Sequence, residues 1–196
     1  MPTLFYDLGS PYAYLAVERA AAVLGVAPRL HPLVLGPIFT LRGHGTWGRT
    51  DAREANQREV EERAVRYGLP PVRWPADWPA NTLRPMRSVL WAQREHGRGE
   101  AFARAAFRAG FAEGADLLDL AVLARIAESV GVPGGPLAAG IEDPAIKEAL
   151  RASTQEAIDL GVRGAPTVLT DDGALVFGDD RLAEAVRPPA TPPARG

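Results

Sequence analysis

The chain of 196 residues contains no cysteine. This absence excludes a disulfide framework, a zinc site with cysteine ligands and any redox reaction carried by the protein's own thiols. No apolar run approaches the roughly 20 residues that a membrane span needs, and the N-terminus lacks a basic segment followed by a long apolar stretch. We therefore expect a cytoplasmic protein that does not enter a membrane.

An excess of charge of one sign is also missing. Lysine and arginine number 22, aspartate and glutamate number 24, and the formal net charge is −2, so nucleic acid is not an expected partner. The chain has three histidines, at positions 31, 44 and 96, and their spacing forms no pair or cluster that suggests a metal site. With 46% hydrophobic residues, the composition is that of an ordinary globular domain.

The first third of the sequence predicts one strand, one helix, a second strand and a long loop. Pro32 lies inside the second strand and indicates an edge strand or a bulge. The stretch GPIFTLRGHGTWGRT after it lacks periodicity and is expected to be a loop, and LPPVRWPADWPANT forms another after one polar helix. The predicted ranges are strand 3–8, helix 11–24, strand 28–35 and helix 52–67.

The rest of the chain predicts a helical block and then a hairpin. Residues 84–161 carry apolar positions at helical spacing, and the last of these helices begins at Asp143-Pro144. Two short apolar runs, PTVLT and ALVF, flank Asp171-Asp172-Gly173, a strong hairpin signal. Residues 180–187 predict a last short helix.

This order predicts an α/β fold, a thioredoxin-like sheet with a large helical insertion domain. A helix between two strands implies that the strands are parallel and joined by a right-handed crossover. The two strands of the terminal hairpin would complete the same sheet. We divide the chain into a thioredoxin-like domain (1–35 and 162–187), a helical insertion with a Gly/Pro-rich loop at its start (36–161) and a disordered tail (188–196).

Ser10 is the first candidate for chemistry. The ordinary interpretation is a helix cap, because serine followed by proline satisfies the first turn of a helix, as Asp143-Pro144 does elsewhere. The position of Ser10 favours a ligand-binding role as well, since ligands bind where a strand ends and a helix begins in α/β sheets. The helix N-terminus there stabilises an anion such as a thiolate, and in a chain without cysteine a ligand would have to bring the thiol.

Two later motifs are weaker when taken alone. Gly164-Ala165-Pro166-Thr167 precedes a strand, where proline is tolerated for backbone reasons. Phe177-Gly178-Asp179-Asp180-Arg181-Leu182 offers either a helix cap, at Asp179 or Asp180, or a carboxylate that meets a ligand's ammonium group.

Together, in this order and spacing, these motifs resemble one family. DLGSPYAYLA is similar to the serine motif of kappa-class glutathione transferases and 2-hydroxychromene-2-carboxylate isomerases, in the DsbA-like branch of the thioredoxin superfamily. GVRGAPT looks like the family's cis-proline loop and FGDDRL like its acidic-arginine motif, while LGPIF and WPANTLRPMR look like further family segments. The resemblance runs from about residue 3 to about residue 187, and redox-active relatives carry Cys-x-x-Cys where this chain has Ser10-Pro11-Tyr12-Ala13.

The resemblance implies glutathione as a cofactor and a small-molecule substrate with a conjugated carbonyl group. Ser10 would be the catalytic residue and hydrogen-bond the glutathione sulfur, which adds to the substrate, lets it rotate and leaves again. The backbone of Ala165, before a cis Pro166, would pair with the cysteinyl backbone, and Asp179 and Asp180 would bind the γ-glutamyl end. The substrate would lie near four side chains that could equally be packing: Tyr12, Trp47, Trp74 and Asn81.

One departure puts the identity of the thiol in doubt. Relatives commonly carry Gly-Asn after LGPIF, where this chain has TLRGHGTWGRT with His44 nearest that position. Either His44 replaces the contact or another low-molecular-weight thiol binds. The helix at 52–67 also lacks the family's pattern of Lys, Tyr and Asp.

Three functions therefore stay open. The first is a glutathione-dependent isomerase of a conjugated carbonyl or aromatic carboxylate. The second is a kappa-type glutathione transferase, and the third is a non-catalytic DsbA-like scaffold that binds a peptide or partner. A serine hydrolase fits poorly, because GSP is not a Gly-x-Ser-x-Gly elbow. Only the resemblance makes a homodimer plausible.

Overall fold

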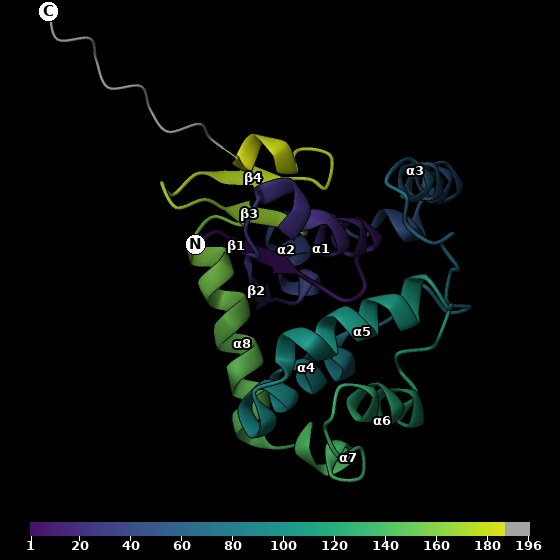
Figure 1. The fold of residues 1–196 in the computed structure, drawn as a ribbon, viewed down its shortest axis with the longest axis vertical. Coiled ribbons are helices and arrows are strands. Elements are labelled where there is room, and N and C mark those ends of the chain that lie inside the picture. Colours follow the sequence, from purple (N-terminus) through teal and green to yellow (C-terminus); the bar gives the residue numbers. More distant parts are fainter. Residues whose placement is uncertain (187–196) are drawn as a thin grey trace, which may run out of the picture.

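The computed structural model describes residues 1–186, and the expected disordered tail, 188–196, lies outside this range. Sheet and helical block lie toward opposite ends of the molecule (Figure 1). The elements, in chain order, are β1 (Thr3–Tyr6), α1 (Pro11–Leu24), β2 (Arg29–Pro32), α2 (Leu35–Leu41), the 3-10 helix η1 (Trp47–Arg49), α3 (Arg53–Arg66), α4 (Leu83–His96), α5 (Gly99–Phe111), α6 (Leu120–Ser129), α7 (Leu137–Gly140), α8 (Pro144–Asp159), β3 (Thr167–Leu169), β4 (Leu175–Phe177) and the 3-10 helix η2 (Leu182–Ala185).

The four strands form one mixed sheet in the order β2-β1-β3-β4. Strands β1 and β2 run parallel with Leu4 opposite Leu30, and β3 runs antiparallel to β1 with Val168 opposite Leu4. The predicted parallel crossover and terminal hairpin are thus confirmed. Pro32 lies on an edge strand, where a missing N–H is tolerated.

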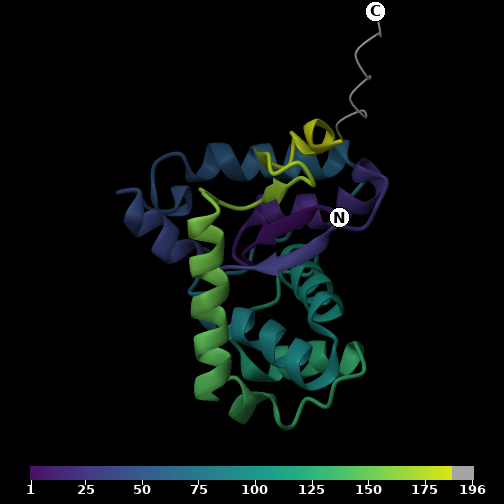
Figure 2. The ribbon, with the colours of Figure 1, turned by 90° about the vertical axis from the view of Figure 1, so that its left-hand side faces the viewer.

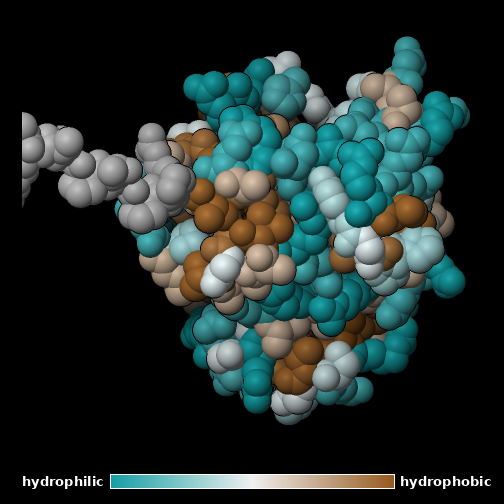
Figure 3. Space-filling model, turned by 45° about the horizontal axis from the view of Figure 1, so that its top comes forward, coloured by the Kyte–Doolittle hydropathy of each residue, from teal (hydrophilic) through white to brown (hydrophobic). Residues whose placement is uncertain are grey.

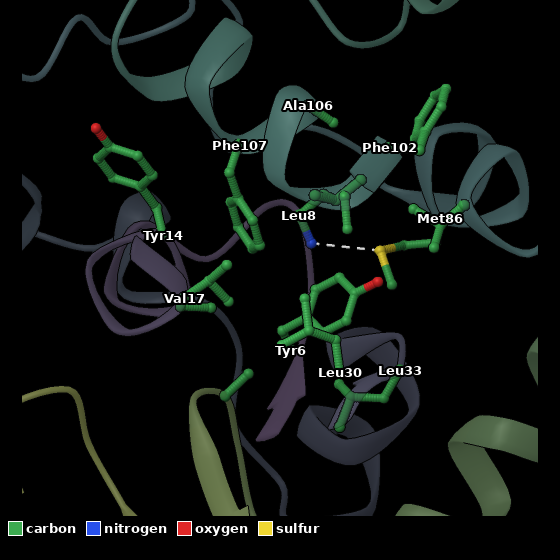
Figure 4. Close-up of a cluster of buried hydrophobic side chains, with 14 of the residues drawn as sticks. Tyr6, Leu8, Tyr14, Val17, Leu30, Leu33, Met86, Phe102, Ala106 and Phe107 are labelled. Atoms are coloured by element: carbon green, nitrogen blue, oxygen red, sulfur yellow. Dashed lines mark hydrogen bonds between the residues drawn. The ribbon is translucent and has the colours of Figure 1, made fainter. Parts of the chain in front are cut away.

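Apolar side chains join the sheet to the helical block. Phe102 and Phe107 of α5 and Met86 of α4 meet Tyr6 and Leu8 from the first strand and the turn after it (Figure 4). The Leu8 backbone N–H donates to the Met86 sulfur at 3.3 Å. Each fully buried side chain of this size contributes about 1.5–3 kcal/mol. This contact fixes the end of β1, and with it the turn that carries Ser10, against α4.

Helix α8 connects the two ends of the molecule. It begins at a cap, because the Asp143 carboxylate accepts from Ala145 N at 2.8 Å and Pro144 occupies the first turn. Figure 2 shows α8 along one side, with α2 near its C-terminal end, and the backbone N–H of Val34 donates to Thr154 Oγ1 at 3.1 Å. Within residues 1–186, no helix is long and apolar enough to cross a bilayer.

Three local predictions were wrong. The stretch after β2, expected to be a loop, contains α2, and the predicted strands 3–8 and 28–35 are shorter because Asp7 and Leu33 begin connections. Leu35 N donates to the buried Asp7 carboxylate at 2.8 Å, so a tertiary contact starts α2 despite its glycine and proline. The last helix is the 3-10 turn η2, whose N-cap is Arg181, so neither Asp179 nor Asp180 is its cap.

The face that carries β4 has apolar side chains at its surface (Figure 3). Leu175 and Phe177 lie on this edge strand with exposed fractions of 38% and 53%, and Val186 follows nearby in the chain. The homodimer stays a prediction.

Candidate functional site

Ser10 lies at the junction of the sheet and α1, and its hydroxyl makes two contacts. It accepts from the Ala13 backbone N–H at 3.2 Å, which is the expected cap, and donates to the Ala165 carbonyl at 3.1 Å. The residue is only 5% exposed. The same hydroxyl therefore caps α1 and contacts the proline loop.

The loop that faces Ser10 begins β3. The peptide bond between Ala165 and Pro166 is cis, as the resemblance implies, and both residues are buried. The Pro166 carbonyl accepts from Gly178 N at 3.0 Å, so the third motif is tied to the second. Gly178 has φ +110°, a left-handed conformation that favours glycine. The first motif is thus brought to the second, although Ser10 and Ala165 are 155 residues apart in sequence, and the third motif joins them through Gly178.

Asp7 holds the turn that presents Ser10. Its carboxylate accepts from Gly9 N at 2.8 Å, Leu35 N at 2.8 Å and Thr82 Oγ1 at 3.1 Å, which joins the starts of three helices. Burial raises the pKa of Asp7, and the hydrogen bonds from Gly9, Leu35 and Thr82 oppose the rise. Asp7 is therefore a positioning residue for the turn.

The acidic motif has an internal cation, which the sequence did not reveal. Asp179 is 1% exposed, and its Oδ1 accepts from the Arg63 guanidinium of α3 at 2.7 Å, while Tyr67 and the Arg19 charge also stabilise the carboxylate. Arg63 also contacts Glu59 at 2.5 Å and Asp180 at 3.5 Å. Burial raises the pKa of Asp179 and the Arg63 charge opposes the rise, whereas the Asp180 carboxylate is half exposed.

Tyr12 and three of the four tryptophans form a layer beside this motif. The Tyr12 hydroxyl donates to Glu59 at 3.2 Å, and burial, with the nearby Glu59 charge, raises its pKa to about 12. The Trp47 ring lies 5.9 Å from the Tyr12 ring and 4.8 Å from that of Trp78, which in turn lies 4.7 Å from Trp74. Trp78 Nε1 donates to the Gly9 carbonyl at 2.9 Å, so this aromatic layer supports the turn before Ser10.

The other two predicted residues lie at the surface. His44 is exposed, and its contacts are the Phe39 ring at 5.1 Å and the Gly45 carbonyl at 3.2 Å, so it lies outside the contacts that surround Ser10. Asn81 is exposed, and its side-chain oxygen accepts from Leu83 N at 2.9 Å just before α4. Asn81 also lines a large pocket beside Asp7 and Gly9.

Comparison with known proteins agrees with this arrangement. The model of the DSBA-like thioredoxin domain matches residues 3–187, nearly the whole chain. The chain belongs to this family. A 2-hydroxychromene-2-carboxylate isomerase of Sphingobium xenophagum is 27% identical over 184 residues, which are 91% of this chain and 92% of the relative.

Solved structures of DSBA-like domains show the same fold. A 2-hydroxychromene-2-carboxylate isomerase superimposes with a TM-score of 0.80 at 23% identity, over 92% of this chain and 90% of the other. The cytosolic disulfide reductase DsbM from Pseudomonas aeruginosa, solved with GSH, gives 0.64 at 22% identity, over 94% and 93%. Without cysteine, however, this DSBA-like chain cannot form or reduce a disulfide through its own thiols.

Sequence reasoning missed several residues that shape the site of this DSBA-like domain. Asp7 stood in the quoted motif, directly after the first strand, and its position was an available signal. Glu59 and Arg63 have the i, i+4 spacing of a helical ion pair, yet nothing local indicated the contact between Arg63 and Asp179, 116 residues away. Only the fold reveals that contact.

Proposed function

We propose that the protein uses a small diffusible thiol as the cofactor of a cis-trans isomerase for conjugated carbonyl substrates. Glutathione is the expected thiol, and 2-hydroxychromene-2-carboxylate is the first substrate to test. The single observation that supports this proposal most strongly is the buried Ser10 hydroxyl at the start of α1, opposite the cis Ala165–Pro166 bond. The similarity to the Sphingobium isomerase favours the reaction class.

The residues around Ser10 suit an anionic sulfur. The hydroxyl can turn its hydrogen from the Ala165 carbonyl to a sulfur anion, and the N-terminus of the 14-residue helix α1 lowers the free energy of negative charge there. The Ala165 carbonyl that Ser10 releases becomes an acceptor for a ligand backbone. The exposed Asp180 carboxylate suits an ammonium group.

The bound thiolate supplies a nucleophile that adds to a conjugated double bond and later leaves, so the thiol is not consumed. The chain's own contribution is to hold the sulfur ionised, to orient the substrate and to limit access of water. Tyr12 keeps its proton at neutral pH, and its hydroxyl, which donates to Glu59 in this structure, can turn to donate to a substrate oxygen instead. The expected cytoplasmic location remains part of this proposal.

Two measurements on the purified chain test this function. Calorimetric titration with glutathione, and then with other small thiols, should detect saturable binding. Turnover of 2-hydroxychromene-2-carboxylate should require that thiol in catalytic amounts and give a product of unchanged mass. A product heavier by the mass of the thiol would establish the transferase instead. Failure of every thiol to bind at millimolar concentration would contradict both enzymes and favour the scaffold.

A further inference from the structure

The large pocket that Asn81 lines adjoins the turn that carries Ser10. It has a volume of about 870 Å³ and lies between the start of α2, the segment before α4 and one face of α8. Gly9, the neighbour of Ser10 in the chain, lines it, as do Asn81 and Thr82. Sites for small molecules commonly measure about 300–1,000 Å³, so this cavity can hold a substrate with one or two rings. We refer to it as the α8 pocket.

The α8 pocket combines an apolar wall with a cationic end. Val34, Leu35 and Phe39 contribute apolar surface from the α2 side, and Leu150 and Ile158 contribute it from α8. Its charged lining residues are one acid, Asp7, whose carboxylate is held by three hydrogen bonds, and four cations, namely Arg49, Arg87, Lys147 and Arg151. In a chain with a net charge of −2, this local excess of positive charge points to an anionic ligand.

Arg87 and Lys147 are the two cations that the fold holds in place. Their side chains are 19% and 29% exposed, whereas that of Arg151 is 71% exposed. Both contact Glu142, with Arg87 Nη1 at 3.6 Å and Lys147 Nζ at 2.6 Å. Arg87 Nε is buried without a hydrogen-bond partner and the Nη1 contact with Glu142 is long, so the guanidinium is only partly paired. The fork of donors on a partly paired guanidinium suits a planar carboxylate.

We propose that Arg87 and Lys147 form the carboxylate subsite for the substrate, with the apolar wall of the α8 pocket against its ring. This proposal rests on the proposed function, because it assigns the anionic end of the substrate of that same site. It makes Arg87 and Lys147 specificity-determining residues, and it makes Glu142 an internal competitor that occupies the two cations when no substrate is bound.

The test compares a carboxylate probe with a neutral probe of nearly the same shape. Cinnamate and cinnamamide are titrated into the protein without thiol, and their dissociation constants are measured by calorimetry. Arg87→Gln and Lys147→Gln should each weaken cinnamate binding at least about tenfold, as expected for a lost charge-assisted contact, and leave cinnamamide unchanged. Glu142→Gln should tighten cinnamate binding, which general damage to the fold would not do.

Arg94→Gln is the matched control, because Arg94 also lies on α4 and pairs with acids at the surface, outside the pocket lining. It should change neither dissociation constant. Lys147→Gln keeps the test decisive if Arg87→Gln fails to fold. Equal weakening of both probes, or no effect in either variant, would overturn the subsite.

Two further results separate this subsite from its alternatives. Glutathione affinity should be unchanged in Arg87→Gln. If glutathione weakens while cinnamate does not, the cations bind a carboxylate of the thiol and the proposal is wrong. If charge-selective cinnamate binding follows the prediction but no thiol supports turnover, the subsite stands and the proposed isomerase fails.

Discussion

Helices α1 and α8 begin with the same local device but differ in their surroundings. Each has a polar cap residue followed by proline, Ser10-Pro11 in one and Asp143-Pro144 in the other, and each cap accepts a backbone N–H of the first turn. Ser10 is 5% exposed and its hydroxyl faces the cis Ala165–Pro166 bond. Asp143 is half exposed and pairs with a surface arginine, Arg94, at 3.4 Å.

The difference shows that a cap becomes a candidate site through long-range contacts. Local sequence specifies both helix starts equally well, because the capping hydrogen bond needs only three or four residues. The proline loop is 155 residues away from Ser10 in sequence, and the fold alone brings it to one cap and not to the other. Comparing substitutions at the two helix starts therefore distinguishes an effect on stability from an effect on catalysis.

The largest expected effect is on turnover. Ser10→Ala should lower the rate of thiol-dependent isomerisation about a hundredfold or more, since it removes a hydrogen-bond donor to an anion. Its cap loss should lower the free energy of unfolding by about 1 kcal/mol. Asp143→Ala, the matched cap variant, should cost a similar stability and leave the rate unchanged. Steady-state kinetics measures the turnover of each variant, and urea denaturation measures its free energy of unfolding. Equal turnover in the two variants would show that Ser10 has no catalytic role beyond that of a helix cap.

The Arg63–Asp179 and Arg94–Asp143 ion pairs should contribute differently to the stability of the protein. Arg63→Met removes the cation that pairs directly with the buried Asp179 carboxylate and should lower the free energy of unfolding by about 3 kcal/mol. Arg94→Met breaks an exposed pair and should cost less than about 1 kcal/mol. Urea denaturation compares them. Adding Asp179→Asn to Arg63→Met should recover part of the loss, and no recovery would argue against an unpaired buried charge as its cause.

A smaller effect concerns the pH dependence of stability around Asp7. Burial raises the pKa of this carboxyl in the folded protein, so above the ordinary value of about 3.9 the native state holds a proton that the unfolded chain releases. The free energy of unfolding should therefore fall as pH rises from about 4 through the raised pKa. Asp7→Asn should make this fall shallower.

The control for the pH series is Asp119→Asn at the start of α6, where an exposed carboxylate caps a helix. Denaturation at several pH values between 4 and 7 should give this control the wild-type slope. An Asp7→Asn slope identical to that of the wild type would mean that the Asp7 carboxyl does not titrate in this window.

The sequence predicted the fold well where the signals were local. Period, caps and the Asp-Gly turn were enough for the crossover, the hairpin and the start of α8, and the three motifs identified the family. Helix α2 was missed because Gly36 and Pro37 resemble a loop, whereas the contact of Leu35 with Asp7 starts a helix there. The last turn was misassigned because the carboxylate of Asp179 binds Arg63 and does not cap η2.

The candidate site could be predicted only in part, for the same physical reason. Ser10 and Pro166 could be found because their neighbours in sequence carry the signal. Arg87 and Lys147 could not, because an arginine on one helix and a lysine on another become a pair only through Glu142 and the packing of α4 beside α8. His44 was chosen by its place in a motif, yet it lies at the surface against Phe39.

The most direct test is the acidity of a bound thiol. Glutathione is saturated on the wild-type protein and on Ser10→Ala, and its thiolate absorbance is followed against pH. Our account predicts a thiol pKa clearly below that of free glutathione on the wild type, and a return toward the free value in the variant. The same pKa for free thiol, wild-type complex and variant complex would contradict it.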